Sequence, residues 1–226
     1  MKKSLILVLF TLIGVRIWAQ QAKLEVRTGI SLPLFAYSSY NLAEGCFTLP
    51  GLSVTAATDL HLWHRLGLKL EGGLQMHAVD VGVLGWEKVQ ADPFLTDMFI
   101  RSDPYRIIHL VAGPNYYFPV MEKLKLDVSA FGGVFFSRTP YQLYKPVYYM
   151  VGPDYYEITP SKDISFAWGA GFRLRYAITD SYELSAGADY MQSAAAFGFN
   201  TSNGLRIDKR MISYLNTTAG VVFYLF

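Results

Sequence analysis

Apolar and polar residues alternate with a period of two along most of the chain after its first twenty residues. Such alternation predicts β-strands with one apolar and one polar face. It recurs in eight segments, at about residues 24–32, 52–62, 66–77, 108–118, 125–136, 164–176, 182–190 and 212–226. In the clearest segment the apolar face carries Ile164, Phe166, Trp168, Ala170, Phe172, Leu174 and Tyr176. Both faces of the last segment are fairly apolar, so its orientation is not fixed by the pattern.

The connections between these segments alternate between long and short. The first, third, fifth and seventh are long, at about residues 34–50, 78–106, 137–163 and 192–211, and the others are short, at 63–65, 120–123 and 177–181. Outer-membrane barrels have an even number of antiparallel strands, tight periplasmic turns and long extracellular loops. The sequence therefore predicts an all-β fold: an eight-stranded antiparallel transmembrane β-barrel over residues 20–226, with both termini in the periplasm.

Aromatic residues gather near the ends of the predicted strands. On the apolar face, Tyr116, Phe118, Tyr176, Tyr182 and Tyr224 lie next to the short turns, and Phe136, Tyr190 and Tyr214 lie near the opposite ends. Two aromatic girdles around an aliphatic band are typical of a membrane-spanning surface. The polar face is also rich in glycine, which suits a narrow lumen. We therefore expect the apolar face to contact outer-membrane lipid; a soluble barrel with its apolar face inside is the alternative.

The first nineteen residues have the layout of a secretory signal peptide. Lys2 and Lys3 precede an apolar stretch over residues 4–15, and Ala19 supplies a small residue at the expected cleavage site. We expect residues 1–19 to be removed, which leaves a barrel in the bacterial outer membrane. A retained membrane anchor is the alternative.

Composition excludes several other classes of protein. The chain has 226 residues, a net charge of +2 and only 17% charged residues, which gives no basic footprint for nucleic acid. Its single cysteine, Cys46, cannot form an intrachain disulfide or a thiolate metal cluster. We expect no cofactor, no metal and no nucleic-acid partner.

The polar faces of the predicted strands carry five basic and six acidic residues that would point into the lumen. These are Arg27, Lys69, Lys125, Arg173 and Arg175, with Glu25, Asp59, Glu71, Asp127, Glu183 and Asp189. Buried charges are tolerated when they are paired and hydrogen-bonded, so this near balance predicts a closed ion-pair network. A small anion path along Arg173 and Arg175, or a narrow solute pore, is the alternative.

Two histidines offer the strongest candidate for chemistry. His77 and His109 fall on the inward face near the outer ends of neighbouring strands, and Asp80 is close in sequence. Such a group can bind a metal or act as a base toward a surface substrate. No hydrolase or metal-ligand motif accompanies it. We expect a non-enzymatic protein in which these side chains join the lumen network; an enzyme that modifies lipid or a surface polymer is the alternative.

The third long connection is rich in tyrosine and proline. Its tyrosines are Tyr141, Tyr144, Tyr148, Tyr149, Tyr155 and Tyr156. Tyrosine gives large contact area with a polar tip, and proline limits the entropy lost on docking. This loop is a candidate surface for binding an envelope protein or glycan, unless its rings pack on one another over the barrel mouth.

Two features carry a family resemblance. The ending Tyr224-x-Phe226 is similar to the terminal signal that delivers outer-membrane barrels to the barrel-assembly machinery. Residues 108–136, IHLVAGPNYYFPVMEKLKLDVSAFGGVFF, together with the later FAWGAGFRLRYAITDSYELSAGADY, resemble the PorT-like group of small Bacteroidota outer-membrane barrels. This resemblance implies a structural or accessory component of an envelope complex, which in some relatives serves type IX secretion.

Overall fold

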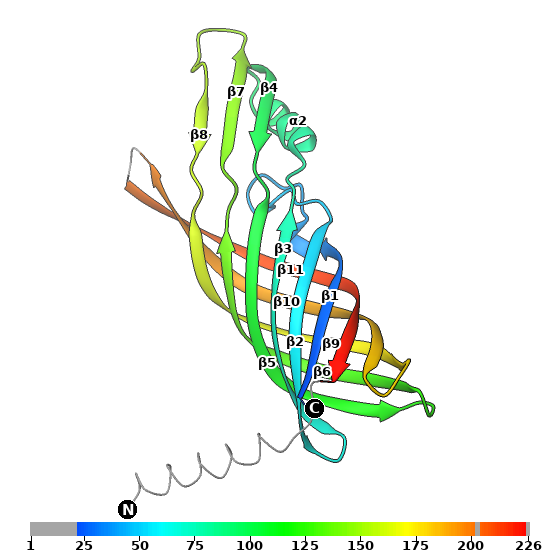
Figure 1. Ribbon diagram of the computed structural model, residues 1–226. Helices are drawn as coiled ribbons and strands as arrows, with labels where there is room; N and C mark the ends of the chain where they lie inside the picture. The colour runs from blue at the N-terminus through cyan, green and yellow to red at the C-terminus, as the bar shows by residue number, and fades with distance from the viewer. Residues whose placement is uncertain (1–21, 202–203, 225–226) are drawn as a thin grey trace, which may run out of the picture.

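The computed structural model describes residues 22–201 and 204–224 of the chain. The predicted signal peptide and Phe226 lie outside these residues. Eight antiparallel strands close a barrel in the order β1-β11-β10-β9-β6-β5-β3-β2 (Figure 1), which confirms the predicted fold. Their bounds are Ala22–Pro33 (β1), Gly51–Trp63 (β2), Leu66–His77 (β3), Tyr105–Pro119 (β5), Leu124–Arg138 (β6), Lys162–Ala177 (β9), Tyr182–Thr201 (β10) and Gly204–Tyr224 (β11).

The long connections form most of the structure beyond one end of the barrel. The first contains a short 3-10 helix, η1 (Phe35–Tyr37), and the second contains helix α2 (Val81–Ala91) and strand β4 (Leu95–Ser102). The third contains β7 (Gln142–Tyr148) and β8 (Tyr156–Ile158). Within the described ranges, no helix is long and apolar enough to cross a membrane.

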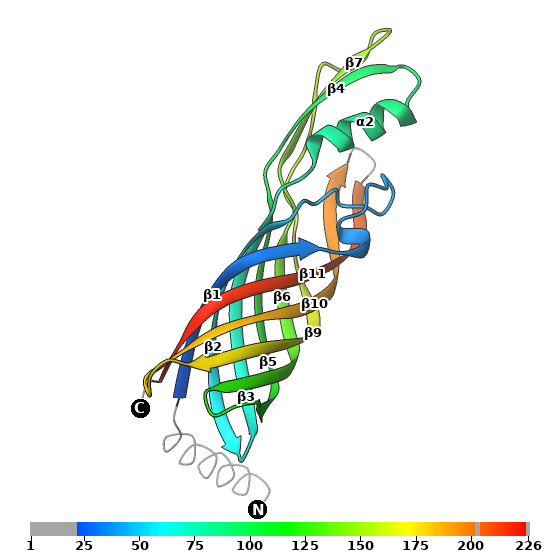
Figure 2. The same cartoon turned by 90° about the vertical axis from the view of Figure 1, so that its right-hand side faces the viewer.

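Strands β4, β7 and β8 form a separate sheet that we call the tongue. Its order, β4-β7-β8, repeats that of the three barrel strands to which it is joined, because β4 leads into β5, β7 follows β6 and β8 leads into β9. The tongue therefore continues one side of the barrel wall well beyond its rim (Figure 1). In the turned view, α2 lies on the side of the tongue that faces the barrel mouth (Figure 2).

The prediction of a loop over residues 192–211 is wrong, because strands β10 and β11 continue into this stretch from either side. Strands β10 and β11 pair from Tyr182↔Phe223 to Thr201↔Gly204, whereas β10 pairs with β9 only as far as Ser193↔Ala167. The small residues of this stretch hide an alternation that the structure reveals, with Ser193, Ala195 and Phe197 buried on one face. The result is a two-stranded extension, which we call the hairpin and which is separate from the tongue.

Apolar side chains cover the outside of the barrel, as predicted. On β9, Phe166 is 69% exposed and Trp168 and Phe172 are also exposed, while Ser165, Ala167 and Arg173 between them are buried. A soluble barrel would bury the apolar set, so this observation excludes that alternative.

Two members of the predicted aromatic girdles are placed on the wrong face. Tyr214 is completely buried inside the barrel, and the Tyr224 hydroxyl donates a hydrogen bond to the buried Glu183 carboxylate. The even-numbered residues of this part of β11 point inward, and Phe223 is exposed instead. The sequence could not show this because both faces of the strand are apolar.

Close strand contacts explain part of the glycine content. A Cβ atom built on Gly113 of β5 would lie 1.8 Å from the carbonyl oxygen of Ala130 on β6, and one on Gly133 would lie 2.2 Å from the carbonyl oxygen of Leu110. Only glycine fits at such positions without a shift of the backbone.

Candidate functional site

Buried ion pairs fill the periplasmic half of the lumen. Arg175 is the best connected, with an Nη2 atom 2.5 Å from Asp59, 3.0 Å from Glu25 and 3.0 Å from Asp127. Arg173 lies 2.5 Å from Asp189, and Arg27 lies 2.5 Å from Glu71. Lys69 Nζ lies 3.6 Å from Asp127 and 3.8 Å from Glu25.

All eleven predicted lumen charges take part in these pairs, and ten of them are buried. The eleventh, Lys125, is 36% exposed because it lies at the periplasmic mouth, where its Nζ donates to Glu183 at 3.0 Å. Paired charges of opposite sign leave no continuous row of free cations along Arg173 and Arg175. The arrangement therefore favours a sealed lumen over an anion path.

The three residues of the predicted histidine cluster have separate partners. His109 contacts Gln75 through Nδ1 at 3.1 Å and Glu71 through Nε2 at 3.4 Å. His77 Nδ1 lies 3.1 Å from the Tyr37 hydroxyl, whereas Asp80 caps α2 by accepting a hydrogen bond from the Val83 amide at 3.1 Å. Among the described residues, no group of three or more His, Cys, Asp or Glu side chains could hold a metal ion.

An aromatic plug closes the lumen above the ion pairs. Phe135 and Tyr214 stack with their ring centroids 5.5 Å apart, and η1 inserts Tyr37 edge-on against His77 at 5.2 Å. All three aromatic side chains are completely buried. The role of Tyr37 could not be predicted from sequence, because this residue follows the predicted first strand and falls in a predicted loop. The only signal is that the apolar stretch continues from Leu34 to Tyr37.

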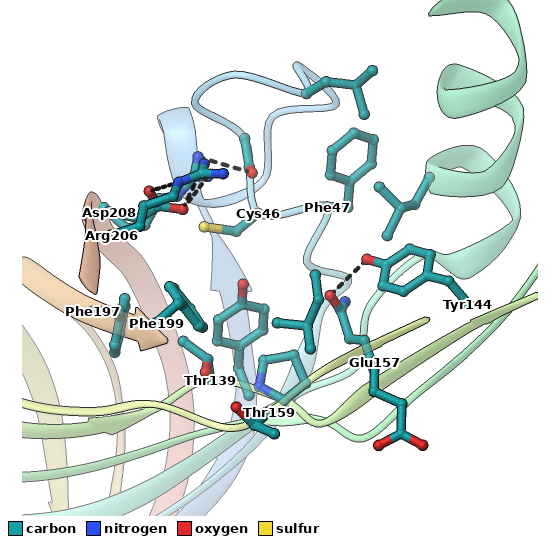
Figure 3. A pocket seen from close by; sticks show the side chains of 18 of the residues that line it. Cys46, Phe47, Thr139, Tyr144, Glu157, Thr159, Phe197, Phe199, Arg206 and Asp208 are labelled. Carbon is teal, nitrogen blue, oxygen red and sulfur yellow. Dashed lines mark hydrogen bonds and ion pairs between the residues drawn. The ribbon is translucent and has the colours of Figure 1, made fainter. Parts of the chain in front are cut away.

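Above the plug lies a cavity of about 410 Å³, which we call the vestibule. Its walls come from the first loop, α2, the tongue and the hairpin, as Figure 3 shows. Tyr105, Phe197 and Phe199 supply aromatic surface. Charged residues also line it, and Arg206 of the hairpin binds Asp208 through two hydrogen bonds of 2.7 and 3.0 Å. The neighbouring Arg210 donates to the carbonyl oxygen of Ala43 at 3.0 Å and so joins the hairpin to the first loop.

Burial shifts the pKa values of several titratable groups around the vestibule. Burial raises the pKa of the Cys46 thiol, which favours the unreactive protonated form. Burial also raises the pKa of Tyr144 and lowers that of Lys88, whose Nζ lies 5.0 Å above the Tyr144 ring.

The tyrosine-rich loop both packs and exposes its rings. Tyr144 is buried and stacks on Tyr156 with centroids 4.6 Å apart, on the face of the tongue that contacts α2. Tyr149 is 84% exposed and Tyr155 is also exposed, while Tyr141 and Tyr148 are half-buried. Packing of rings on one another therefore describes Tyr144 and Tyr156, whereas Tyr149 and Tyr155 are available for contact with a partner.

Comparison with known proteins identifies the fold. No family model matches the chain, and no curated protein matches it in sequence. A major outer membrane protein from Thermus thermophilus has a similar structure, with a TM-score of 0.50, 10% identity, and coverage of 91% of this chain and 98% of that one. Neisserial surface protein A gives a TM-score of 0.48 with 13% identity, over 90% of this chain and 97% of the other. The attachment invasion locus protein Ail of Yersinia pestis gives 0.46 with 10% identity, over 90% and 99%.

The fold and the chain's own surface agree on location. The barrel shares the architecture of outer-membrane proteins, and the outer faces of its strands are apolar where such proteins meet lipid. The chain is a multi-pass β-barrel protein of a bacterial outer membrane.

Proposed function

We propose that this barrel is a closed, non-enzymatic component of an envelope complex that holds the tongue above the membrane for docking to another envelope protein. The outer face of the tongue supports this proposal most directly. It points away from α2 and lies beyond the barrel rim, so neither the protein core nor lipid tails account for its exposed apolar side chains.

The residues of this outer face have the composition of a protein-binding surface. Phe99 and Val147 are 61% and 53% exposed, and the half-buried Leu143 lies on the same face. Charged side chains of both signs surround them, namely Asp97, Arg101, Lys145 and Glu157. Apolar anchors ringed by charged and polar groups are typical of protein interfaces. The opposite face packs on α2, which keeps the platform rigid.

The PorT-like resemblance suggests the class of partner. Some relatives in that group serve type IX secretion, so a component of that secretion complex is the partner we would look for first. The barrel itself would be delivered to the membrane by the barrel-assembly machinery, which would recognise Tyr224 and Phe226.

Co-purification after extraction in mild detergent tests the docking role. We expect wild-type protein to retain a stoichiometric partner, and the double variant F99S/V147S to lose it. The matched control is L205S/I207S, which removes two similarly exposed apolar side chains from the hairpin. Loss of the partner in the control but not in the tongue variant would contradict the proposal.

Two further measurements separate this proposal from a pore and from an enzyme. In planar bilayers we expect no steady conductance, because ion pairs and the Phe135–Tyr214 plug fill the lumen; a stable single-channel current would identify a pore. Replacing His77 and His109 with glutamine should leave the lipids and surface polymers of the cell unchanged. A lost modification in that variant would identify an enzyme.

A further inference from the structure

A second cavity, of about 250 Å³, opens at the periplasmic mouth of the barrel. Its charged residues and histidines are Lys23, Asp59, His61, His64, Arg65 and Lys125, and Tyr117 also lines it. They come from β1, from the end of β2 and its turn into β3, and from β6. Three elements of the barrel thus direct basic groups at one space, and a single carboxylate lies among them.

That carboxylate and the nearby Glu183 neutralise the basic groups only in part. Asp59 is already bound by Arg175 at 2.5 Å, from deeper in the lumen. Lys23 and Lys125 share Glu183, with N–O distances of 3.8 and 3.0 Å, so the two lysines carry one positive charge in excess. The Arg65 guanidinium has no carboxylate within ion-pair distance among the described residues. The deeper lumen has one more carboxylate than it has cations, because Arg175 is shared by Glu25, Asp59 and Asp127, and this offsets the excess charge of the two lysines. The mouth therefore keeps about one uncompensated positive charge, that of Arg65, and two imidazoles that can donate hydrogen bonds.

The position of the cavity relative to the membrane indicates where an anion would come from. Tyr116, Phe118, Tyr176 and Tyr182 are exposed on the outside of the barrel at this end, and so is Trp63, the last residue of β2, which adjoins His64 of the turn. Exposed aromatic rings of this kind lie at the level of lipid headgroups. The mouth thus opens where phosphate groups of the periplasmic leaflet are concentrated.

We propose that this cavity is a phosphate-binding site, which takes either the headgroup phosphate of an anionic phospholipid or a free periplasmic phosphate. Arginine and lysine bind phosphate oxygens through charge-assisted hydrogen bonds, and a guanidinium can offer two parallel donors. The site is independent of the tongue and of the function proposed for it. Its occupation would add bonds between β1, the β2–β3 turn and β6 at the one end of the barrel that no extramembrane sheet covers.

The four histidines of the chain provide a direct readout. With 13C-labelled imidazoles, His61 and His64 report on the cavity, while His77 and His109 lie deep in the lumen and serve as internal references. In detergent, titration with inorganic phosphate at constant ionic strength should shift the resonances of His61 and His64 alone. In nanodiscs without added phosphate, a 4:1 mixture of phosphatidylcholine and phosphatidylglycerol should produce the same shift relative to phosphatidylcholine alone if the lipid is the source.

Charge-removing variants decide whether the shift reports a built site. R65Q and K125Q should each weaken binding roughly tenfold, because a hydrogen bond to a charged group contributes about that factor. Arg65 has no ion pair to lose, so R65Q keeps the fold. K162Q at the outer end of β9 is the matched control. The proposal is overturned if neither probe shifts His61 and His64, or if R65Q and K125Q bind as tightly as K162Q.

Discussion

The replacement R175M tests how much the barrel depends on its sealed charges. Arg175 is fully buried and contacts three carboxylates, those of Glu25, Asp59 and Asp127. After its removal Glu25 keeps Lys69, Arg173 and Arg27, and Asp127 keeps Lys69. The Asp59 carboxylate keeps only the Asn115 amide, at 3.5 Å. Asp59 thus becomes a buried carboxylate without a cation within ion-pair distance.

The contacts allow the size of the effect to be estimated. Breaking a buried ion pair by removing one partner costs about 3–5 kcal/mol, because the other charge stays buried and uncompensated. We expect R175M to lower the free energy of unfolding by that amount. Adding D59N removes the stranded charge, so the double variant R175M/D59N should recover about 1–3 kcal/mol, which is the usual range for coupling between residues in contact.

Urea unfolding in lipid vesicles, followed by the gel-mobility shift of the folded barrel, measures these differences. R206M is the matched control, because Arg206 also binds an aspartate at 2.7 Å but is 66% exposed, and such surface pairs contribute only about 0–1 kcal/mol. A loss below about 1 kcal/mol in R175M, or a double variant no more stable than R175M, would refute the reasoning.

Other predictions concern packing outside the charged lumen. Because burial raises the pKa of Cys46, its thiolate forms only at higher pH. We therefore expect iodoacetamide to label Cys46 at pH 8 at least about tenfold more slowly than it labels a free cysteine. Equal labelling rates would show that the first loop does not bury this thiol. In the same unfolding assay, G113A should destabilise the barrel by about 1–3 kcal/mol, because the new Cβ would clash with Ala130. A Cβ on Gly82 of α2 would lie 3.6 Å from its nearest neighbour, so G82A should be neutral or stabilising by up to about 1 kcal/mol. Y144A removes the ring that stacks on Tyr156 and lies under Lys88, so the amides of α2 should exchange hydrogen faster; unchanged exchange would mean that α2 does not depend on this pair.

The barrel could be predicted from sequence because lipid imposes a simple rule on each strand. Every second residue from Ile164 to Tyr176 must be apolar, and strand ends are marked by long and short connections, so faces and topology follow together. The same alternation predicts the charges of the lumen, since Arg173 and Arg175 lie on the face of β9 opposite to that of Phe172 and Leu174. Where both faces are apolar, as at Tyr214 and Tyr224, the rule gives no orientation.

The parts beyond the barrel rim could not be predicted in this way. The tongue pairs Phe99 with Lys145 and buries Tyr144 under α2, contacts between segments more than forty residues apart that no local pattern encodes. The hairpin extension could not be predicted either, because the small residues at 193–196 give almost no contrast between the two faces of the strand. The periplasmic cavity likewise arises only when closure of the barrel brings β1 and β6 to the same mouth as the β2–β3 turn.

The direction in which the apolar faces point supports every other conclusion, and tryptophan fluorescence tests it directly. Two single-tryptophan proteins are needed, one that keeps Trp168 on the outside of β9 and one that keeps Trp86, which is exposed on α2. In vesicles of lipids with brominated acyl chains, we expect strong quenching of Trp168 and none of Trp86, while aqueous acrylamide should quench only Trp86. If acrylamide quenches Trp168 and brominated lipid does not, the apolar faces do not touch the membrane and the account is wrong.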